Sequence, residues 1–124
     1  MFKAMLIAGI GGFAGTCLRF LTGKFAHLVC NSAFPWGTFA VNVIGCFLIG
    51  LLFGLAEKTQ LLSSSMNVLL ITGFCGGFTT FSTFSDDIYV LLQQRQTGYL
   101  VLYVLSSLLL GLLMVRLGRS IVKG

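Results

Sequence analysis

The residues best suited to chemistry lie in one polar, glycine-rich stretch of an otherwise apolar chain. Residues 72–85 read TGFCGGFTTFSTFS and precede two acids, Asp86 and Asp87. Adjacent glycines and adjacent threonines disfavour the middle of a helix, so we expect a break between Gly76 and Thr80. A break frees backbone carbonyls, which in apolar surroundings must face protein, water or an ion, and broken helices of membrane proteins bind ions in this way. The alternative is an unbroken helix with a small-residue packing face.

Side chains beyond the expected break carry ring edges and hydroxyl groups. Phe81 and Phe84 are three residues apart and share one helical face. Ser82 and Ser85 share a neighbouring face, with Thr83 between them. Aromatic ring edges are partly positive, so rings beside hydroxyl donors would suit a small anion. The plainer interpretation places the rings in lipid or in the core and pairs each hydroxyl with the carbonyl four residues earlier.

Polar residues also stand inside two earlier apolar segments. The Asn42 amide offers two donors and an acceptor and needs either a packing partner or a permeating ion. A charge at the depth of Arg19 costs about 2.5–3.5 kcal/mol on insertion scales. Arg19 therefore reaches the headgroups, pairs with Asp86 or Asp87, or attracts an anion. The two aspartates either pair with arginine or face water, or act as gate or vestibule carboxylates.

The remaining reactive residue types form no catalytic constellation. Tyr103 and Ser107 are four apart and either face those hydroxyls or bond between helices, and His27 is expected to be an interfacial bystander. The glycine runs lack the strand–helix setting of a nucleotide-binding loop. The four cysteines, at 17, 30, 46 and 75, form no C-x-x-C pair and imply neither a disulfide framework nor a zinc site. An enzyme is not expected.

Composition indicates which elements position these residues. The 124 residues are 56% hydrophobic and 9% charged, with a mean hydropathy of +0.99, whereas soluble domains carry about 25% charged residues. So little charge excludes a soluble enzyme, a disordered tail and a nucleic-acid-binding domain. The net charge of +5 comes from basic residues that are scattered, mostly near the ends of apolar runs, rather than clustered. The chain is therefore expected to be an all-α integral membrane protein.

Four apolar runs are long enough to cross a membrane, which takes about 20 residues. The expected spans are residues 4–29, 37–56, 66–94 and 98–117, with the third broken at its middle. The first run is interpreted as a retained helix rather than a signal peptide, because Arg19 interrupts any cleavage region. Leu61 and Leu62 with Ser63 to Ser65 predict a helix N-cap before Met66. Short connections lead us to expect one four-helix membrane domain over residues 1–124.

The distribution of basic residues bears on orientation. Four spans put both termini on one side, which then holds five basic residues against three, a weak positive-inside bias. Such a bias permits insertion in both orientations and would allow an antiparallel dimer. The two sets are Lys3, Lys58, Arg116, Arg119 and Lys123, and Arg19, Lys24 and Arg95.

Glycines favour close packing of the helices. The first span carries Gly9, Gly12 and Gly15, and the second carries Gly45, Gly50 and Gly54. Small residues at such spacings let helix backbones approach within and between subunits. We therefore expect an oligomer, the alternative being packing within one chain only.

Three motifs together resemble those of the Fluc (CrcB) family of fluoride channels. They are residues 12–20, GFAGTCLRF, residues 37–45, GTFAVNVIG, and residues 73–84, GFCGGFTTFSTF. The resemblance covers nearly the whole chain. It implies an antiparallel dual-topology homodimer with two pathways that passively exports fluoride from the cytoplasm through the inner cell membrane.

The resemblance also implies roles for individual residues. A structural sodium ion at the dimer centre would be held by the backbone carbonyls of Gly76 and Thr79 from each subunit, in keeping with the preference of hard cations for oxygen ligands. Arg19 corresponds to the family's arginine in the first helix. Asp87 stands where relatives often carry glutamate, which leaves its structural or vestibule role open. The implied ion pathway consists of Asn42, Phe81, Phe84, Ser82 and Thr83, with Tyr103 and Ser107 on the fourth helix.

Two other function classes fit the sequence less well than a channel. A proton-coupled transporter resembling the small multidrug-resistance class would need a carboxylate in its first helix, and no acid precedes Glu57. A structural or assembly protein of the membrane would not need a polar, helix-breaking third span. Flux measurements in liposomes separate both from a channel.

Overall fold

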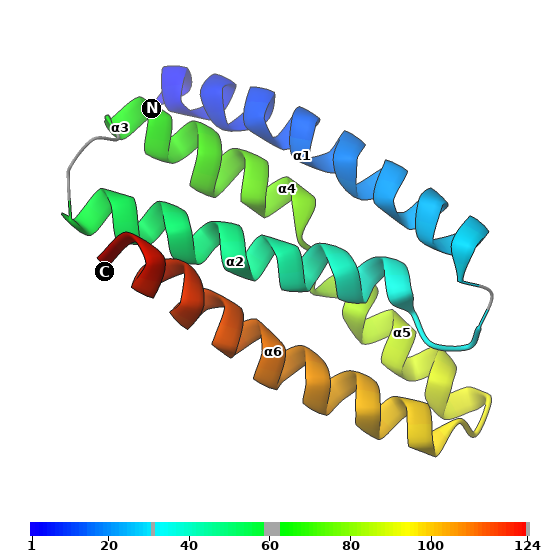
Figure 1. Cartoon of the computed structure of the whole chain (residues 1–124). Coiled ribbons are helices and arrows are strands. Elements are labelled where there is room, and N and C mark those ends of the chain that lie inside the picture. Colours follow the sequence, from blue (N-terminus) through cyan, green and yellow to red (C-terminus); the bar gives the residue numbers. More distant parts are fainter. Residues whose placement is uncertain (31, 59–62, 124) are drawn as a thin grey trace.

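The computed structural model describes residues 1–30, 32–58 and 63–123 and consists of helices that lie side by side (Figure 1). The connection between residues 57 and 65 is therefore described only in part, and Leu61 and Leu62 lie outside the described residues. The helical elements are α1 (Phe2–Val29), α2 (Trp36–Lys58), α3 (Ser64–Asn67), the π-helical η1 (Val68–Cys75), α4 (Gly76–Phe78), α5 (Ser82–Gln93) and α6 (Thr97–Lys123).

Four candidate membrane spans occur within the described residues, as the sequence predicts. They are Phe2–Val29, Trp36–Lys58, Ser64–Gln93 and Thr97–Lys123, each long and apolar enough to cross a membrane. The fourth helix continues six residues past the expected end at 117. The predicted cap is present, because the Ser63 hydroxyl accepts a hydrogen bond from the Met66 N–H at 3.1 Å. Both termini lie at the same end of the bundle (Figure 1).

The third span is broken where the sequence predicts it. α4 ends at Phe78, Thr79 is extended with φ −90° and ψ 161°, and α5 begins at Ser82. The half before the break differs from expectation, since Val68–Cys75 is π-helical rather than α-helical. Hydropathy does not distinguish the two kinds of helix, because both can bury the same apolar residues.

Glycines bring α1 against the first half of the third span. A Cβ on Gly11 would overlap the Leu69 carbonyl oxygen, and one on Gly77 would lie 2.7 Å from the Gly12 carbonyl oxygen. Such contacts let the two backbones touch without side chains between them. Gly12 and Gly15 therefore pack as expected, whereas Gly9 meets no atom within 4 Å in the described chain.

A second close contact joins α2 to α6. A Cβ on Gly50 would overlap the Val115 carbonyl oxygen, and one on Gly118 would lie 2.7 Å from the Leu51 nitrogen. At the end shared with the termini, Arg119 pairs with Glu57 at 2.9 Å. These contacts fix α2 and α6 as one parallel pair.

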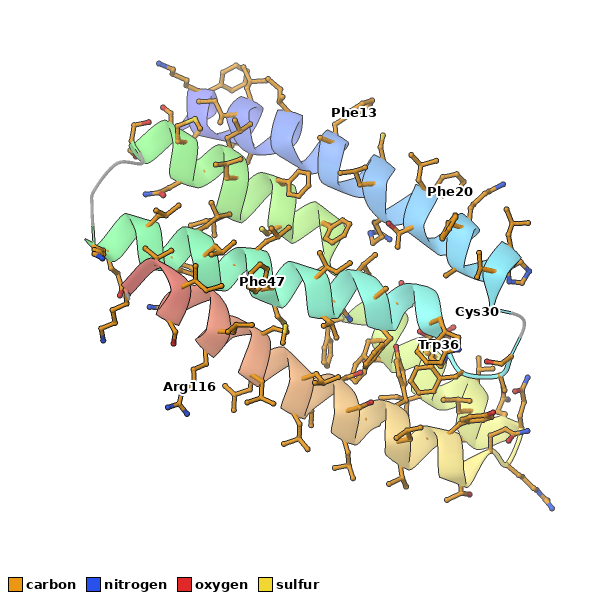
Figure 2. All side chains as sticks on the ribbon, in the orientation of Figure 1. Phe13, Phe20, Cys30, Trp36, Phe47 and Arg116 are labelled. Atoms are coloured by element: carbon orange, nitrogen blue, oxygen red, sulfur yellow. The ribbon has the colours of Figure 1, made fainter. Side chains whose placement is uncertain are left out.

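Large apolar side chains cover the outside of the bundle. Phe13 projects from α1 away from the other helices and is 74% exposed (Figure 2), and Phe20 on the same helix is 63% exposed. The buried apolar cluster of the described residues is small and mostly aromatic, built on Phe34, Leu91 and Tyr103. An outer surface of this kind is suited to lipid or to a second subunit, which supports the membrane assignment.

Candidate functional site

The broken third helix is held by side chains from the two neighbouring helices. Arg19 of α1 donates from Nε to the Gly77 carbonyl at 2.9 Å. Asn42 of α2 donates from Nδ2 to the Thr80 carbonyl at 3.0 Å, and its Oδ1 accepts from the Thr80 N–H at 2.9 Å. Backbone groups at a break have lost their helical partners and need replacements in apolar surroundings. These two side chains supply them.

Arg19 therefore has a partner that was not among the sequence-based options. It binds a freed carbonyl, and no ion pair between it and Asp86 or Asp87 occurs within the described residues. The guanidinium group also faces an open cleft. The position of Arg19 is thus compatible with the prediction that its charge attracts an anion.

Asn42 has the packing partner that one interpretation required. Only one of its two amide hydrogens is used by the Thr80 carbonyl. The side chain also lines a small pocket beside the break. The second hydrogen is thus free to serve a ligand in that pocket.

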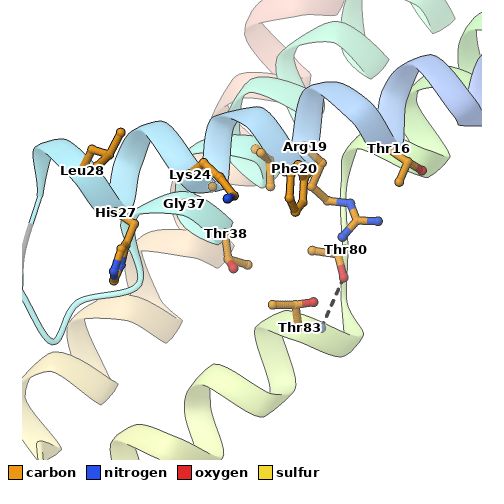
Figure 3. A pocket seen from close by; sticks show the side chains of 12 residues that line it. Thr16, Arg19, Phe20, Lys24, His27, Leu28, Gly37, Thr38, Thr80 and Thr83 are labelled. Atoms are coloured by element: carbon orange, nitrogen blue, oxygen red, sulfur yellow. Dashed lines mark hydrogen bonds between the residues drawn. The ribbon is translucent and has the colours of Figure 1, made fainter.

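A cleft of about 900 Å³ opens between α1, the start of α2 and the start of α5 (Figure 3). Arg19, Lys24 and His27 bring basic groups to it, and Thr80 and Thr83 form its inner end. None of the twelve described residues that line it is acidic. The cleft therefore attracts anions toward the break.

A second pocket of about 250 Å³ lies on the other side of Thr80, which lines both spaces. It brings together four of the residues expected along the ion pathway with Thr80 and three others, Cys46, Thr79 and Leu108. The buried Ser107 Oγ has no hydrogen-bond partner among the described residues, so its hydroxyl is free to donate within them. The four expected residues are Asn42, Phe81, Phe84 and Ser107.

The two phenylalanines differ in their surroundings. Phe81 stands at the N-terminal end of α5 and is 78% exposed, while Phe84 is half-buried and packs against Tyr103 with ring centroids 5.0 Å apart. The centroids of Phe81 and Phe84 are 6.0 Å apart. One ring therefore faces outward from this chain and the other faces its interior.

The hydroxyls after the break form a short local network. The Thr80 Oγ1 accepts from the Thr83 N–H at 3.2 Å, as a helix-capping side chain does (Figure 3). It also lies 3.4 Å from the Ser82 Oγ. The Thr83 side chain lines the cleft. Thr80 was not singled out from the sequence as a pathway residue, although its place at the end of the expected break could have suggested it.

Asp87 and Tyr103 form a pair that spacing alone did not reveal. The Tyr103 hydroxyl donates to the Asp87 Oδ2 at 3.0 Å, and Tyr103 is fully buried. Asp86 is exposed. Tyr103 therefore lies behind Phe84 and holds a carboxylate, rather than lining the small pocket with Ser107.

The carbonyls of Gly76 and Thr79 fit a cation that prefers oxygen ligands. Neither accepts a hydrogen bond from any described residue, because the Thr80 and Thr83 N–H groups are bound to side chains instead. A Cβ on Gly76 would meet no atom of the described residues within 4 Å, so the chain is open at that position.

The fold and the site define a class of molecule. It is a multi-pass membrane protein in which a broken helix separates a cationic cleft from a small pocket lined by an amide, a hydroxyl and aromatic rings. Proteins built in this way move or bind small ions.

Comparisons with known proteins identify the family. The model of the CrcB-like protein, Camphor Resistance (CrcB) family matches residues 6–119, so the chain belongs to that family. A relative named fluoride-specific ion channel FluC from Methylobacillus flagellatus is 44% identical over 124 residues, covering 99% of this chain and 96% of that one. Relatives of the same name from Chlorobium phaeobacteroides and Prosthecochloris aestuarii are 42% and 43% identical over 122 residues, covering 98% of this chain and 94% of each.

Proposed function

We propose that this chain is a fluoride-specific ion channel that passively exports fluoride across the inner cell membrane. The observation that carries the proposal is the small pocket, in which the unpaired Ser107 hydroxyl and the Asn42 amide face Phe81 and Phe84. The shared name of relatives that match nearly the full chain supports the same ion. The activity is transport rather than catalysis.

The residues of the pathway replace the water that a small, strongly hydrated anion gives up. The cations of the cleft raise the anion concentration near Thr83. Beyond Thr80, the free Asn42 N–H and the Ser107 hydroxyl donate hydrogen bonds. The positive ring edges of Phe81 and Phe84 supply weaker contacts.

We propose further that the working unit is an antiparallel dual-topology homodimer with two pathways. The weak charge bias of the sequence permits both orientations, and Phe81 is exposed in the single chain. A second subunit would cover that ring. The carbonyls of Gly76 and Thr79 would hold a structural sodium ion between the subunits. Its positive charge would favour anions nearby.

Fluoride efflux from liposomes tests the channel. Purified protein should release fluoride rapidly, as measured by a fluoride electrode, and should not release chloride. Phe81→Ile should lower the flux while the dimer survives in detergent. Prolonged replacement of sodium by N-methylglucamine should also lower it. A folded dimer that releases neither ion would overturn the proposal in favour of an assembly protein, and proton-coupled uptake would favour a transporter.

A pair of adjacent serines gives a sharper test of the pocket. Ser107→Ala removes an unpaired buried hydroxyl, so the protein should remain as stable as the unmodified chain while fluoride flux falls. Ser106→Ala is the matched control, because the Ser106 hydroxyl bonds to the Leu102 carbonyl of its own helix. Equal flux in the two variants would remove Ser107 from the pathway.

A further inference from the structure

Gly45 of α2 is buried against the break in the third span. A Cβ at this position would overlap the Thr79 Cγ2 methyl. Its other neighbours, Phe78 Cδ2 and Thr79 Cβ, would both lie at 3.6 Å, which is ordinary van der Waals contact. The one obstacle to a side chain at Gly45 is therefore a single methyl group.

That methyl group cannot turn aside freely. The Thr79 hydroxyl donates to the Cys75 carbonyl at 2.9 Å, which fixes the orientation of the side chain. The Thr79 N–H donates to the same carbonyl at 3.0 Å. Rotation of the threonine would break a hydrogen bond in apolar surroundings. A larger residue at position 45 must therefore displace the backbone of the break or disrupt this bond.

Gly45 shares its helical face with Asn42, three residues earlier. Asn42 binds the Thr80 backbone through two hydrogen bonds. The side chain of Thr79, the residue before Thr80, packs against Gly45. α2 thus contacts two consecutive residues of the break. Phe81 follows directly, so its position depends on how closely this segment approaches α2.

We propose that Gly45 is a positioning residue of the ion pathway: by admitting the Thr79 methyl group, it sets the distance between α2 and the break. This inference rests on the proposed channel function and assigns a role to a residue that touches no ion. Gly50 and Gly54 on the same helix differ from it, because they meet residues of α6 and serve packing of that pair.

A double-mutant cycle tests this role. Gly45→Ala adds the obstructing Cβ, and Thr79→Ser removes the obstructing methyl group while keeping the hydroxyl that binds Cys75. Fluoride flux and thermal unfolding are measured for both single variants and for the double variant. Gly9→Ala is the control, because a Cβ there meets nothing within 4 Å in the described chain. Flux from the unmodified protein establishes the channel function separately.

Gly45→Ala should lower fluoride flux about tenfold, equivalent to about 1.4 kcal/mol, and Gly9→Ala should not. Fluoride flux of the double variant should return to within about twofold of the flux of Thr79→Ser. The two substitutions would then not multiply, and a departure from multiplication by more than about twofold is expected only for neighbouring residues. If Gly45→Ala does not fold, the proposal predicts that the double variant does fold. Undiminished flux in Gly45→Ala, or a double variant no better than Gly45→Ala in flux and folding, would overturn the proposal.

Discussion

Replacement of Asn42 by alanine probes the contact on which the broken helix depends. In the native protein, the Asn42 amide satisfies both the N–H and the carbonyl of Thr80, at 2.9 and 3.0 Å. Alanine supplies neither partner. The extended backbone on the Thr79 side of this residue cannot restore helical hydrogen bonds, so both Thr80 groups would be left unpaired in a half-buried position.

The cost can be bounded from two directions. Interhelical side-chain hydrogen bonds in membranes contribute about 0.6 kcal/mol each on average, because the unfolded state also finds partners. A buried backbone group left unsatisfied costs about 1–3 kcal/mol. Two bonds at the first figure give about 1.2 kcal/mol, and two unsatisfied groups at the second give about 2–6 kcal/mol. Because the break is only half-buried, the expected loss of unfolding free energy for Asn42→Ala lies between these limits, at about 2–4 kcal/mol.

Unfolding in mixed detergent micelles, at fixed protein concentration, measures this loss. The chain has one tryptophan, Trp36, which serves as the fluorescence probe. Asn67→Ala is the matched control, because the Asn67 Oδ1 is buried and has no hydrogen-bond partner in the part of the chain that the structure describes. That change should leave stability unaltered or improve it. If the two variants unfold within about 0.5 kcal/mol of each other, a difference typical of neutral substitutions, the Thr80 contact is not what holds the break.

Three further substitutions have distinct expected effects. Gly50→Val should prevent assembly of the α2–α6 pair, seen as loss of folded protein on size-exclusion chromatography, because its side chain would overlap the backbone of α6. Tyr103→Phe removes one donor to the Asp87 carboxylate, leaving that of Thr38, and should cost about 1.5–3 kcal/mol in the same unfolding assay, the value of a hydrogen bond to a charged group. Glu57→Gln should cost under about 1 kcal/mol, since its pair with Arg119 is exposed; a larger loss would assign that pair a structural role.

Hydropathy and residue type were sufficient for the architecture. Four apolar runs predicted four spans because the length of a membrane helix follows from the thickness of the bilayer. The break near Thr79 was also predictable, since adjacent glycines and threonines act on the local backbone. Three motifs of the sequence were enough to indicate the family.

The partners of the buried polar groups depended on tertiary structure. Arg19 and the Gly77 carbonyl are 58 residues apart, and the sequence offered two aspartates as more obvious partners. Asp87 instead accepts from Tyr103. Which carbonyl is orphaned, and which side chain reaches it, depends on the rotation of each helix about its axis, and the composition of a span does not specify that rotation.

Close packing of the helices was likewise determined in part by the sequence and in part by the tertiary structure. The sequence supplied glycines and their spacing, but Gly9 meets open space while Gly45 receives a threonine methyl group from a segment more than thirty residues away. A glycine matters only when another group occupies the volume that its missing side chain leaves. The sequence determined that helices could approach closely, and the tertiary structure decided where they do, because only the folded chain brings distant atoms together.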